Sequence, residues 1–341
     1  MRRFVVLTLV LACITAAGVL AAQQQGARPA GAAPPQWAYG FYGPPGTPEP
    51  PAPPETPAPK GLLTLAGSTK SYPFDQINNG YGPADWFPEM HPAMPDVVAH
   101  GERQRMIAAC GNCHLPNGKG RPTNASVSGL SEGYFFQTMM DFRNGLRKTS
   151  DARKTNTNRM MLFAKAMTDD EIREIAKYFG SIPWTPWTRV VETDMVPKTH
   201  IVGGMYIANE GATAGKEPIG QRIIEVPENA ELADVYRDPR SGYIAYVPPG
   251  SLKKGEGLAK ALQCAVCHGP TLDGIGPVPS IAGRLASYTM RQLFDMQQGN
   301  RKGTWTDLMK PVVAKLSTED LMNLAAYTAS MAPKEQSRAA K

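Results

Sequence analysis

The sequence predicts a mainly α-helical fold in which two copies of one module are joined by a β-rich or irregular segment. The two copies follow from a repeat, because a shift of 154 residues aligns HGERQRMIAACGNCH with KGEGLAKALQCAVCH. The helices follow from apolar residues at helical spacing behind capping sequences. The strands follow from apolar, β-branched pieces that alternate with Gly and Pro between the two copies.

The repeat continues beyond the aligned motifs. The same shift pairs Tyr134 with Tyr288 and Arg147 with Arg301. Five extra residues in the first copy then change the shift to 149, which aligns MMLFAKAMTDDEIREIAKYFGS with MKPVVAKLSTEDLMNLAAYTAS. We therefore place a first module at 95–183 and a second at 250–333.

Each module is expected to contain the same series of helices. A helix should enter the C-x-x-C-H sequence, and a second helix should occupy 131–144 or 287–298. An irregular stretch with a methionine should follow, and a closing helix should end the module. The closing helices should begin at caps formed by two pairs, Thr168 with Glu171 and Ser317 with Asp320.

The sequence C-x-x-C-H occurs once in each module and is typical of covalent haem c attachment. Its six residues are Cys110, Cys113, His114, Cys264, Cys267 and His268. Each thiol can add across a vinyl group of the porphyrin, and the adjacent imidazole can bind the iron. A zinc site or two disulfides would also use these cysteines. Zinc, however, would not require His in the same place twice.

A sixth iron ligand is expected from one methionine in each module. Met160 and Met309 both precede the closing cap by the same distance, and a thioether there would raise the haem potential. Met161 is an alternative to its neighbour. Three further histidines could ligate instead, but none recurs in the second module: His91, His100 and His200.

Arginine recurs after the second helix of each module, as Arg147 and Arg301. A guanidinium can pair with a haem propionate through two hydrogen bonds, so both residues are candidates for binding the cofactor. The alternative is a solvated cation at a helix end. Trp305 is a candidate for lining the second haem pocket.

These motifs together resemble those of bacterial dihaem class I cytochromes c of the cytochrome c4 type. In the second module the resemblance rests on CAVCHGP, PSIAG at 279–283, YTMRQLFDMQQGNR, and Met309 before LSTEDLMNLAAYTAS. It implies two tandem class I cytochrome c domains with two covalently bound haem c groups. Where the second module has Pro279, in the region that lies against the proximal imidazole in this family, the first module has Ala125.

The resemblance also implies a function: a periplasmic cytochrome that carries electrons from a dehydrogenase or quinol-oxidising complex to a terminal acceptor. Such a carrier is not itself an enzyme, and its partners are redox proteins. One alternative is a cytochrome subunit of a periplasmic dehydrogenase complex. Another is a dihaem peroxidase-like enzyme, which would need an iron with a missing or displaceable ligand.

Four segments lie outside the two modules. Residues 1–22 are typical of a secretory signal, or of a membrane anchor if they are not cleaved. Residues 23–94 should form a disordered, Pro-rich tether and an irregular lead-in. The β-rich segment at 184–249 could bridge the modules or dock a partner, and 334–341 is a tail.

The charge of the chain limits its partners. The net charge is +6, and the first module contains 13 basic and 9 acidic residues, which suits an acidic redox partner. No basic run alternates with aromatic residues, so nucleic acid is not an expected partner.

Overall fold

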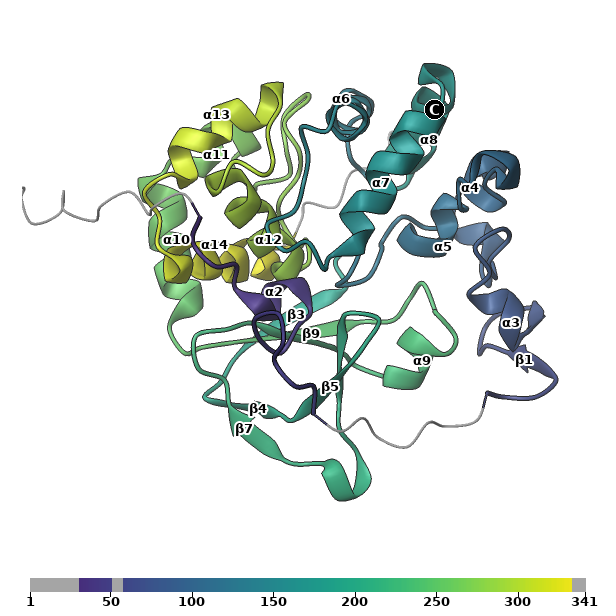
Figure 1. Cartoon of the computed structure of the whole chain (residues 1–341), viewed down its shortest axis with the longest axis horizontal. Helices are drawn as coiled ribbons and strands as arrows, with labels where there is room; N and C mark the ends of the chain where they lie inside the picture. The colour runs from purple at the N-terminus through teal and green to yellow at the C-terminus, as the bar shows by residue number, and fades with distance from the viewer. Residues whose placement is uncertain (1–30, 51–57, 333–341) are drawn as a thin grey trace, which may run out of the picture.

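The computed structural model describes residues 31–50 and 58–332. The fold is mainly helical, with 40% helix and 14% strand, as the sequence predicted. Two groups of helices lie side by side above a layer of strands (Figure 1). The predicted signal or anchor at 1–22 and the tail at 334–341 lie outside the described residues. Within the described ranges, no helix combines the length and the apolar character needed to cross a bilayer.

The two modules contain corresponding helices. Those of the first module are α4 (Asp96–Ala99), α5 (Cys110–His114), α6 (Glu132–Arg143), α7 (Thr155–Ala166) and α8 (Asp169–Ser181). Those of the second module are α10 (Ser251–Ala261), α11 (Cys264–His268), α12 (Ala286–Gln297), α13 (Thr304–Val313) and α14 (Thr318–Ser330). The helices predicted at 131–144 and 287–298 are confirmed as α6 and α12.

The helix expected to enter the first C-x-x-C-H sequence is shorter than predicted. In the second module α10 leads into the motif, but in the first α4 ends at Ala99 and a tight turn separates it from the motif. Glu102 and Ile107 exchange backbone hydrogen bonds of 2.7 and 2.9 Å across this turn. Gly101 adopts a φ of +69°, and a Cβ there would lie 2.3 Å from the Ile107 carbonyl oxygen. Close backbone packing, which favours glycine, therefore interrupts the helix.

The methionines lie on helices and not, as expected, on irregular stretches. Met160 is on α7 and Met309 is on α13. Met160, Phe163 and Met167 all line the central cavity. Their spacing of three and four residues places them on one face of a helix. The apolar contact with the cavity therefore stabilises helical structure there.

Both predicted capping boxes are confirmed. The Thr168 hydroxyl accepts a hydrogen bond from the Glu171 backbone N–H at the start of α8, and the Glu171 carboxylate accepts one from the Thr168 N–H in return. Ser317 and Asp320 make the same exchange at the start of α14.

The middle segment is β-rich, as predicted. Its strands are β3 (Thr188–Glu192), β4 (Met195–Pro197), β5 (Thr199–Val202), β6 (Met205–Ala208), β7 (Lys216–Pro218), β8 (Ile224–Pro227) and β9 (Tyr243–Val247). Strands β3 and β9 pair in parallel, and β8 adds to β9 antiparallel. Two antiparallel pairs, β4 with β7 and β5 with β6, and the short helix α9 (Ala230–Asp234) complete the segment.

The lead-in is more ordered than its proline content suggested. Helix α2 (Gln36–Tyr39) packs on α12, and the buried Tyr39 hydroxyl donates a 2.7 Å hydrogen bond to Asp295. Further along, a hairpin of β1 (Leu62–Thr64) and β2 (Ser71–Pro73) precedes α3 (Phe74–Ile77). Aromatic residues among the prolines bury enough apolar area to dock the chain, so the expectation of a disordered tether is wrong for residues 31–50.

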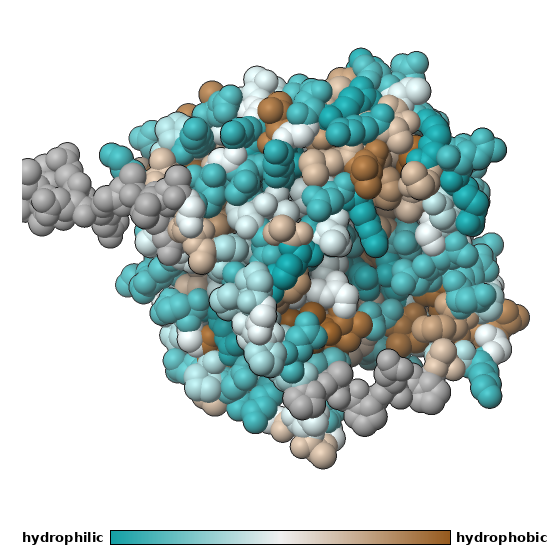
Figure 2. All heavy atoms as spheres, viewed as in Figure 1, coloured by the Kyte–Doolittle hydropathy of each residue, from teal (hydrophilic) through white to brown (hydrophobic). Residues whose placement is uncertain are grey.

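Three apolar clusters hold the helical part together. Each module has its own core, built on the stripe of its closing helix. A third cluster connects the two modules through the middle segment; its buried members include Leu115, Trp184, Trp187, Tyr243 and Leu285. On the face drawn in Figure 2, hydrophilic residues dominate and hydrophobic ones occur in small groups.

Candidate haem-binding site

The two halves of the repeat meet at one cavity of about 370 Å³. All ten site residues predicted from the sequence line it: Cys110, Cys113, His114, Arg147, Met160, Cys264, Cys267, His268, Arg301 and Met309. Residues separated by about half the chain are therefore brought into one place. Trp305 lines the same cavity, as predicted.

Each C-x-x-C-H sequence forms a single helical turn, α5 or α11. This places the two cysteines three positions apart on one side of the turn, with the histidine next to the second cysteine. The residue after the histidine has a positive φ in both modules, 63° at Leu115 and 84° at Gly269. The chain therefore turns away at once, and both thiols stay at the cavity wall.

Both motif histidines are held by the same type of hydrogen bond. The Nδ1–H of His114 donates to the Ala125 carbonyl oxygen at 2.8 Å, and that of His268 donates to the Pro279 carbonyl oxygen at 2.9 Å. Because a carbonyl can only accept, Nδ1 carries the proton and Nε2 is left to bind a metal. A backbone group makes the bond, so Ala in place of Pro at 125 preserves it.

Burial keeps these imidazoles neutral. Desolvation lowers the pKa of His114, and the positive charge of Arg147 lowers it further. Desolvation also lowers the pKa of His268. A neutral imidazole is the form that ligates iron.

The four described cysteines form no disulfide with one another. Burial raises the pKa of Cys110 to about 12, so its thiol is neutral. No three His, Cys, Asp or Glu side chains gather as a metal site in the part of the chain that the structure describes. The two pairs therefore do not combine into a four-cysteine zinc site, and each pair remains with its own histidine.

The structure separates the two methionine candidates of the first module. Met160 lines the cavity, whereas Met161 is not among the lining residues. In the second module Met309 lines the cavity from α13, together with Trp305 and Leu308. The three other histidines do not line it; they contact Asp85, Asp96 and Asn209, in the order His91, His100 and His200.

The cavity wall carries a large excess of positive charge. Its basic side chains are Arg147, Lys148, Lys154, Arg159, Arg284, Arg291 and Arg301, against one carboxylate, Asp295. All of these except Lys148 and Arg159 are buried. Buried cations are costly unless anions neutralise them. Haem propionates are anions of the required kind, so the cavity fits haem by charge as well as by its apolar lining.

Arg284 is one of the basic residues that give the cavity wall its excess of positive charge. It is buried, with its guanidinium over the Trp184 ring at 4.0 Å, and its Nη1 reaches the Ser126 carbonyl at 3.4 Å. Its Nε and Nη2 have no hydrogen-bond partner. Desolvation lowers the pKa of Arg284 to about 10, yet the group remains a cation at neutral pH. Two unsatisfied donors at the cavity wall suit a carboxylate of the cofactor.

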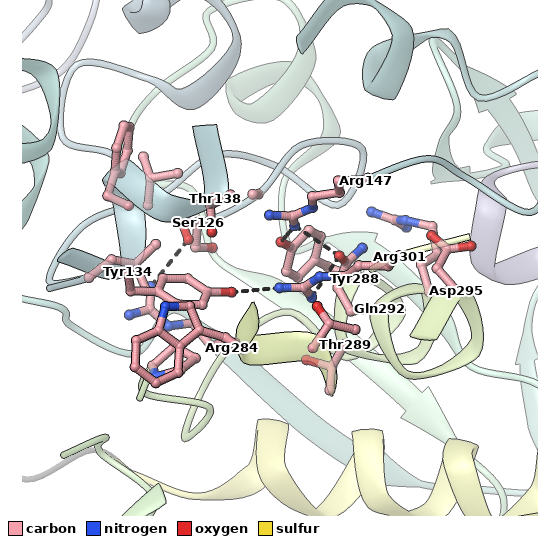
Figure 3. Close-up of a pocket in the computed structure, with 18 of the residues that line it drawn as sticks. Ser126, Tyr134, Thr138, Arg147, Arg284, Tyr288, Thr289, Gln292, Asp295 and Arg301 are labelled. Carbon is pink, nitrogen blue, oxygen red and sulfur yellow. Dashed lines mark hydrogen bonds between the residues drawn. The ribbon is translucent and has the colours of Figure 1, made fainter. Parts of the chain in front are cut away.

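The side chains of Arg147 and Arg301 each reach a tyrosine of the other module (Figure 3). Arg147 donates to the hydroxyl of Tyr288 at 2.8 Å, and Arg301 donates to the hydroxyl of Tyr134 at 2.8 Å. Both also donate to Gln292 Oε1, at 2.9 and 3.0 Å. Both arginines are buried, so the alternative of a solvated cation is wrong.

Backbone hydrogen bonds also connect the two modules in both directions. Lys148 N–H donates to the Asn300 carbonyl, and Lys302 N–H donates to the Leu146 carbonyl, both at 2.7 Å. Arg147 and Arg301, which occupy equivalent positions in the repeat, therefore pair with each other at the junction between the modules. Sequence reasoning found the repeated arginines but not their exchange of partners.

Three buried cations of the cavity wall were not predicted from the sequence: Lys154, Arg284 and Arg291. For Arg291 a signal was present, because it lies beside Met290 and three positions before Phe294, both buried in the predicted helix at 287–298. A charged residue in an apolar helical pattern indicates a buried partner. No such signal marks the other two.

Comparison with known proteins agrees with these features. Residues 98–183 match the family "Cytochrome c", and residues 250–327 match "Cytochrome C oxidase, cbb3-type, subunit III". The chain is 31% identical to cytochrome c4 of Stutzerimonas stutzeri over 138 residues, which are 34% of this chain and 65% of that protein. The matched part thus spans about two thirds of that relative.

Two shorter relatives are covered more completely. Cytochrome c-554(548) of Halomonas halodenitrificans is 37% identical over 22% of this chain and 90% of its own length. The cytochrome subunit of sulfide dehydrogenase of Chlorobaculum tepidum is 30% identical over 31% of this chain and 88% of its own length. The paired motifs, the two cytochrome c domains and these relatives agree. The chain belongs to the class I cytochromes c, as a dihaem electron-transfer protein that resembles cytochrome c4 and carries covalently bound haem c.

Proposed function

We propose that this cytochrome is an exported electron carrier that accepts electrons from a dehydrogenase or quinol-oxidising complex and delivers them to a terminal acceptor. The observation that supports this most directly is the shared cavity, which is lined by both C-x-x-C-H motifs and by both candidate ligand methionines, Met160 and Met309. A carrier needs irons whose coordination is complete, so that electrons move but substrates do not bind.

In this proposal Cys110, Cys113 and His114 would hold the first haem, and Met160 would supply a further iron ligand. Cys264, Cys267, His268 and Met309 would hold the second in the same way. Haem supplies one-electron redox chemistry at its iron. The chain fixes each imidazole through its Nδ1–H bond, excludes water with the apolar lining, and neutralises the propionates with buried arginines.

Resistance to small ligands tests the proposal against a dihaem peroxidase-like enzyme. The purified holoprotein should keep its spectrum in millimolar cyanide and should not consume hydrogen peroxide, while a strong reductant should reduce both haems. Rapid peroxide turnover, or a spectrum that cyanide changes within seconds, would identify an iron with an open position and would overturn the carrier.

A second candidate function is a cytochrome subunit held permanently by a dehydrogenase. The likeness to the cytochrome subunit of a sulfide dehydrogenase favours it. Mild purification from the native host distinguishes the two. A carrier should elute alone, whereas a subunit should co-elute with a dehydrogenase at a constant ratio through successive columns.

Export remains part of the proposal. Residues 1–22 carry the signal-like sequence, and covalent haem attachment in an exported protein agrees with it. Cell fractionation followed by intact mass analysis tests it. A periplasmic protein that has lost about 22 residues supports a cleaved signal. A full-length chain in the membrane fraction supports an anchor, and a cytoplasmic holoprotein contradicts export.

A further inference from the structure

We propose that redox partners dock on the second module, at an uncharged surface around Cys267, and that the middle segment closes the equivalent surface of the first module. This inference rests on the proposed carrier function and adds where the carrier exchanges electrons. Each module has an attachment face, defined as residues 110–123 in the first and 264–277 in the second, which the 154-residue shift makes equivalent.

The two attachment faces differ in exposure. In the first module no residue of the face is exposed. In the second module seven are exposed, and none of them is charged: Ala265, Val266, Cys267, Pro270, Ile275, Gly276 and Pro277. Val266 is 72% exposed and Ile275 is 53% exposed. Single exposed apolar side chains are common on proteins, but a run of uncharged, exposed residues on one face is typical of an interaction surface.

The middle segment closes the face of the first module with polar contacts. Arg237 donates to the Asn112 carbonyl oxygen. Asn117 Nδ2 donates to the Pro239 carbonyl oxygen at 2.8 Å, and Arg121 lies 3.6 Å from the Asp234 carboxylate.

Apolar packing adds to this closure. Leu115 lies in the cluster with Trp184, Trp187 and Tyr243, and Lys119 lies over the Trp187 ring at 5.6 Å. A protein approaching the first motif would have to displace these residues.

The amino-acid sequences of the two attachment faces differ in the same way as their exposure. Val266 and Ile275 occupy the positions of Asn112 and Arg121, which the middle segment contacts in the first module through the Asn112 backbone carbonyl and the Arg121 guanidinium. The second module has apolar residues where the first has polar ones, although no residue in the described ranges 31–50 and 58–332 covers them. Burial among the described residues does not explain these apolar side chains, but contact with another protein does.

The uncharged surface also reaches the cavity. Cys267, Pro277 and Leu308 are exposed and line the cavity, so a partner seated here lies next to the second haem-binding motif. Leu308 is 65% exposed. In the first module the exposed lining residues are Lys148 and Arg159, both charged.

Charge indicates the kind of partner. Around Leu308, the exposed charged residues between 302 and 315 are Lys302, Asp307, Lys310 and Lys315. No ion pair within the described residues involves these three lysines, so the rim presents unpaired positive charge. An uncharged centre with a basic rim fits a redox protein whose cofactor edge is apolar and surrounded by carboxylates. Each encounter would transfer one electron between that cofactor and the haem of the second module.

The test uses the holoprotein at a gold electrode coated with mixed hydroxyl- and carboxylate-terminated alkanethiols, which reproduces an uncharged surface with acidic groups. Val266→Asp and Ile275→Asp should slow interfacial electron transfer about tenfold at low salt, because each buries a carboxylate against an acidic surface. Val266→Asn, which restores the residue of the first module, should slow it less. Met106→Asp and Leu162→Asp are matched controls, since these residues of the first module are 78% and 64% exposed.

The controls should change the rate less than twofold, and none of the variants should alter the haem spectrum. Equal rates for the patch variants and the wild type would overturn the docking surface and leave the carrier function intact. Slowing by Met106→Asp or Leu162→Asp instead would place docking on the first module. Failure of the wild-type holoprotein to exchange electrons with the electrode, together with peroxide turnover, would overturn the carrier function itself.

Discussion

At the scale of single residues, the chemistry of each haem depends on which atom lies opposite the motif histidine. In the second module Met309 lines the cavity together with His268, and in the first module Met160 does so with His114. A thioether ligand stabilises the reduced iron and raises the potential.

Removing these thioethers gives the first prediction. Met309→Ala and Met160→Ala should each lower the potential of one haem by on the order of 0.1 V, a fraction of the range that axial ligands span. Each should also allow cyanide to bind that haem. Met161→Ala is the matched control and should change neither property, because Met161 does not line the cavity. Spectroelectrochemistry of the three variants checks this, and a potential shift in Met161→Ala alone would reverse the assignment.

Motif residues could be predicted from the sequence because their chemistry depends on local spacing. Cys264, Cys267 and His268 lie within five positions, and one helical turn is enough to arrange them. The unsatisfied donors of Arg284 could not be predicted, because they depend on Trp184 and Ser126, which lie far away in the chain.

At the scale of elements, the capping box of α8 combines with an ion pair. Glu171 accepts hydrogen bonds from Thr168 and from Arg105, and the bond from Arg105 contributes most to lowering its pKa to about 2. Since the folded-state pKa lies below the ordinary value, the ionised carboxylate stabilises the fold at neutral pH. This contribution is lost as the pH falls from about 4.5 towards 2.

Glu171→Gln should therefore destabilise the protein by about 1 kcal/mol at pH 7 and by roughly half of that or less at pH 3. Glu174→Gln is the control for charge, because Glu174 is exposed on the same helix and forms no ion pair there. Thermal unfolding at both pH values checks the prediction. An effect of Glu171→Gln that does not depend on pH would contradict it.

Helices α10 and α14 cross at a glycine. A Cβ on Gly255 would lie 2.1 Å from the Asn323 carbonyl oxygen, whereas one on Gly257 would meet nothing within 4 Å. Both glycines lie inside α10. The same substitution should therefore have opposite effects at the two positions.

Gly255→Ala should destabilise the second module by about 1–3 kcal/mol through overpacking. Gly257→Ala should stabilise it by roughly 0.5–1 kcal/mol, because alanine is the better helix former. Denaturant unfolding followed by haem absorbance measures both. Similar changes of one sign in the two variants would show that the crossing does not depend on Gly255.

Elements with local signals were predicted well, and those set by tertiary contacts were not. The caps of α8 and α14 lie within four residues of sequence and were found. The turn at Gly101 depends on the chain returning against itself at Ile107, and it ends the expected helix early. The lead-in at 31–50 folds because Tyr39 reaches Asp295, 256 positions away.

At the scale of the whole molecule, the middle segment ties the two modules into one unit. Trp187 lies in the cluster that includes Leu115 of the first module and Leu285 of the second. Its ring also packs edge-on against Tyr243, with centroids 5.2 Å apart. The sequence predicted strands here, but the surfaces that they cover depend on contacts between distant parts of the chain.

Trp187→Ala should destabilise both modules together, by about 3–5 kcal/mol. Haem absorbance and calorimetry should both report one transition at a lower temperature. Met195→Ala, at a residue of the same segment that is 42% exposed, is the control and should change little. Two separate transitions in the wild-type protein would contradict a single cooperative unit.

The central claim is that one chain holds two haems, each closed by protein ligands on both sides. A spectroelectrochemical titration of the purified holoprotein, with its haem content fixed by intact mass, tests this most directly. We predict two covalently bound haems, two one-electron steps, and methionine–iron charge transfer in the oxidised protein. A single haem per chain, or a five-coordinate iron in the resting protein, would contradict it.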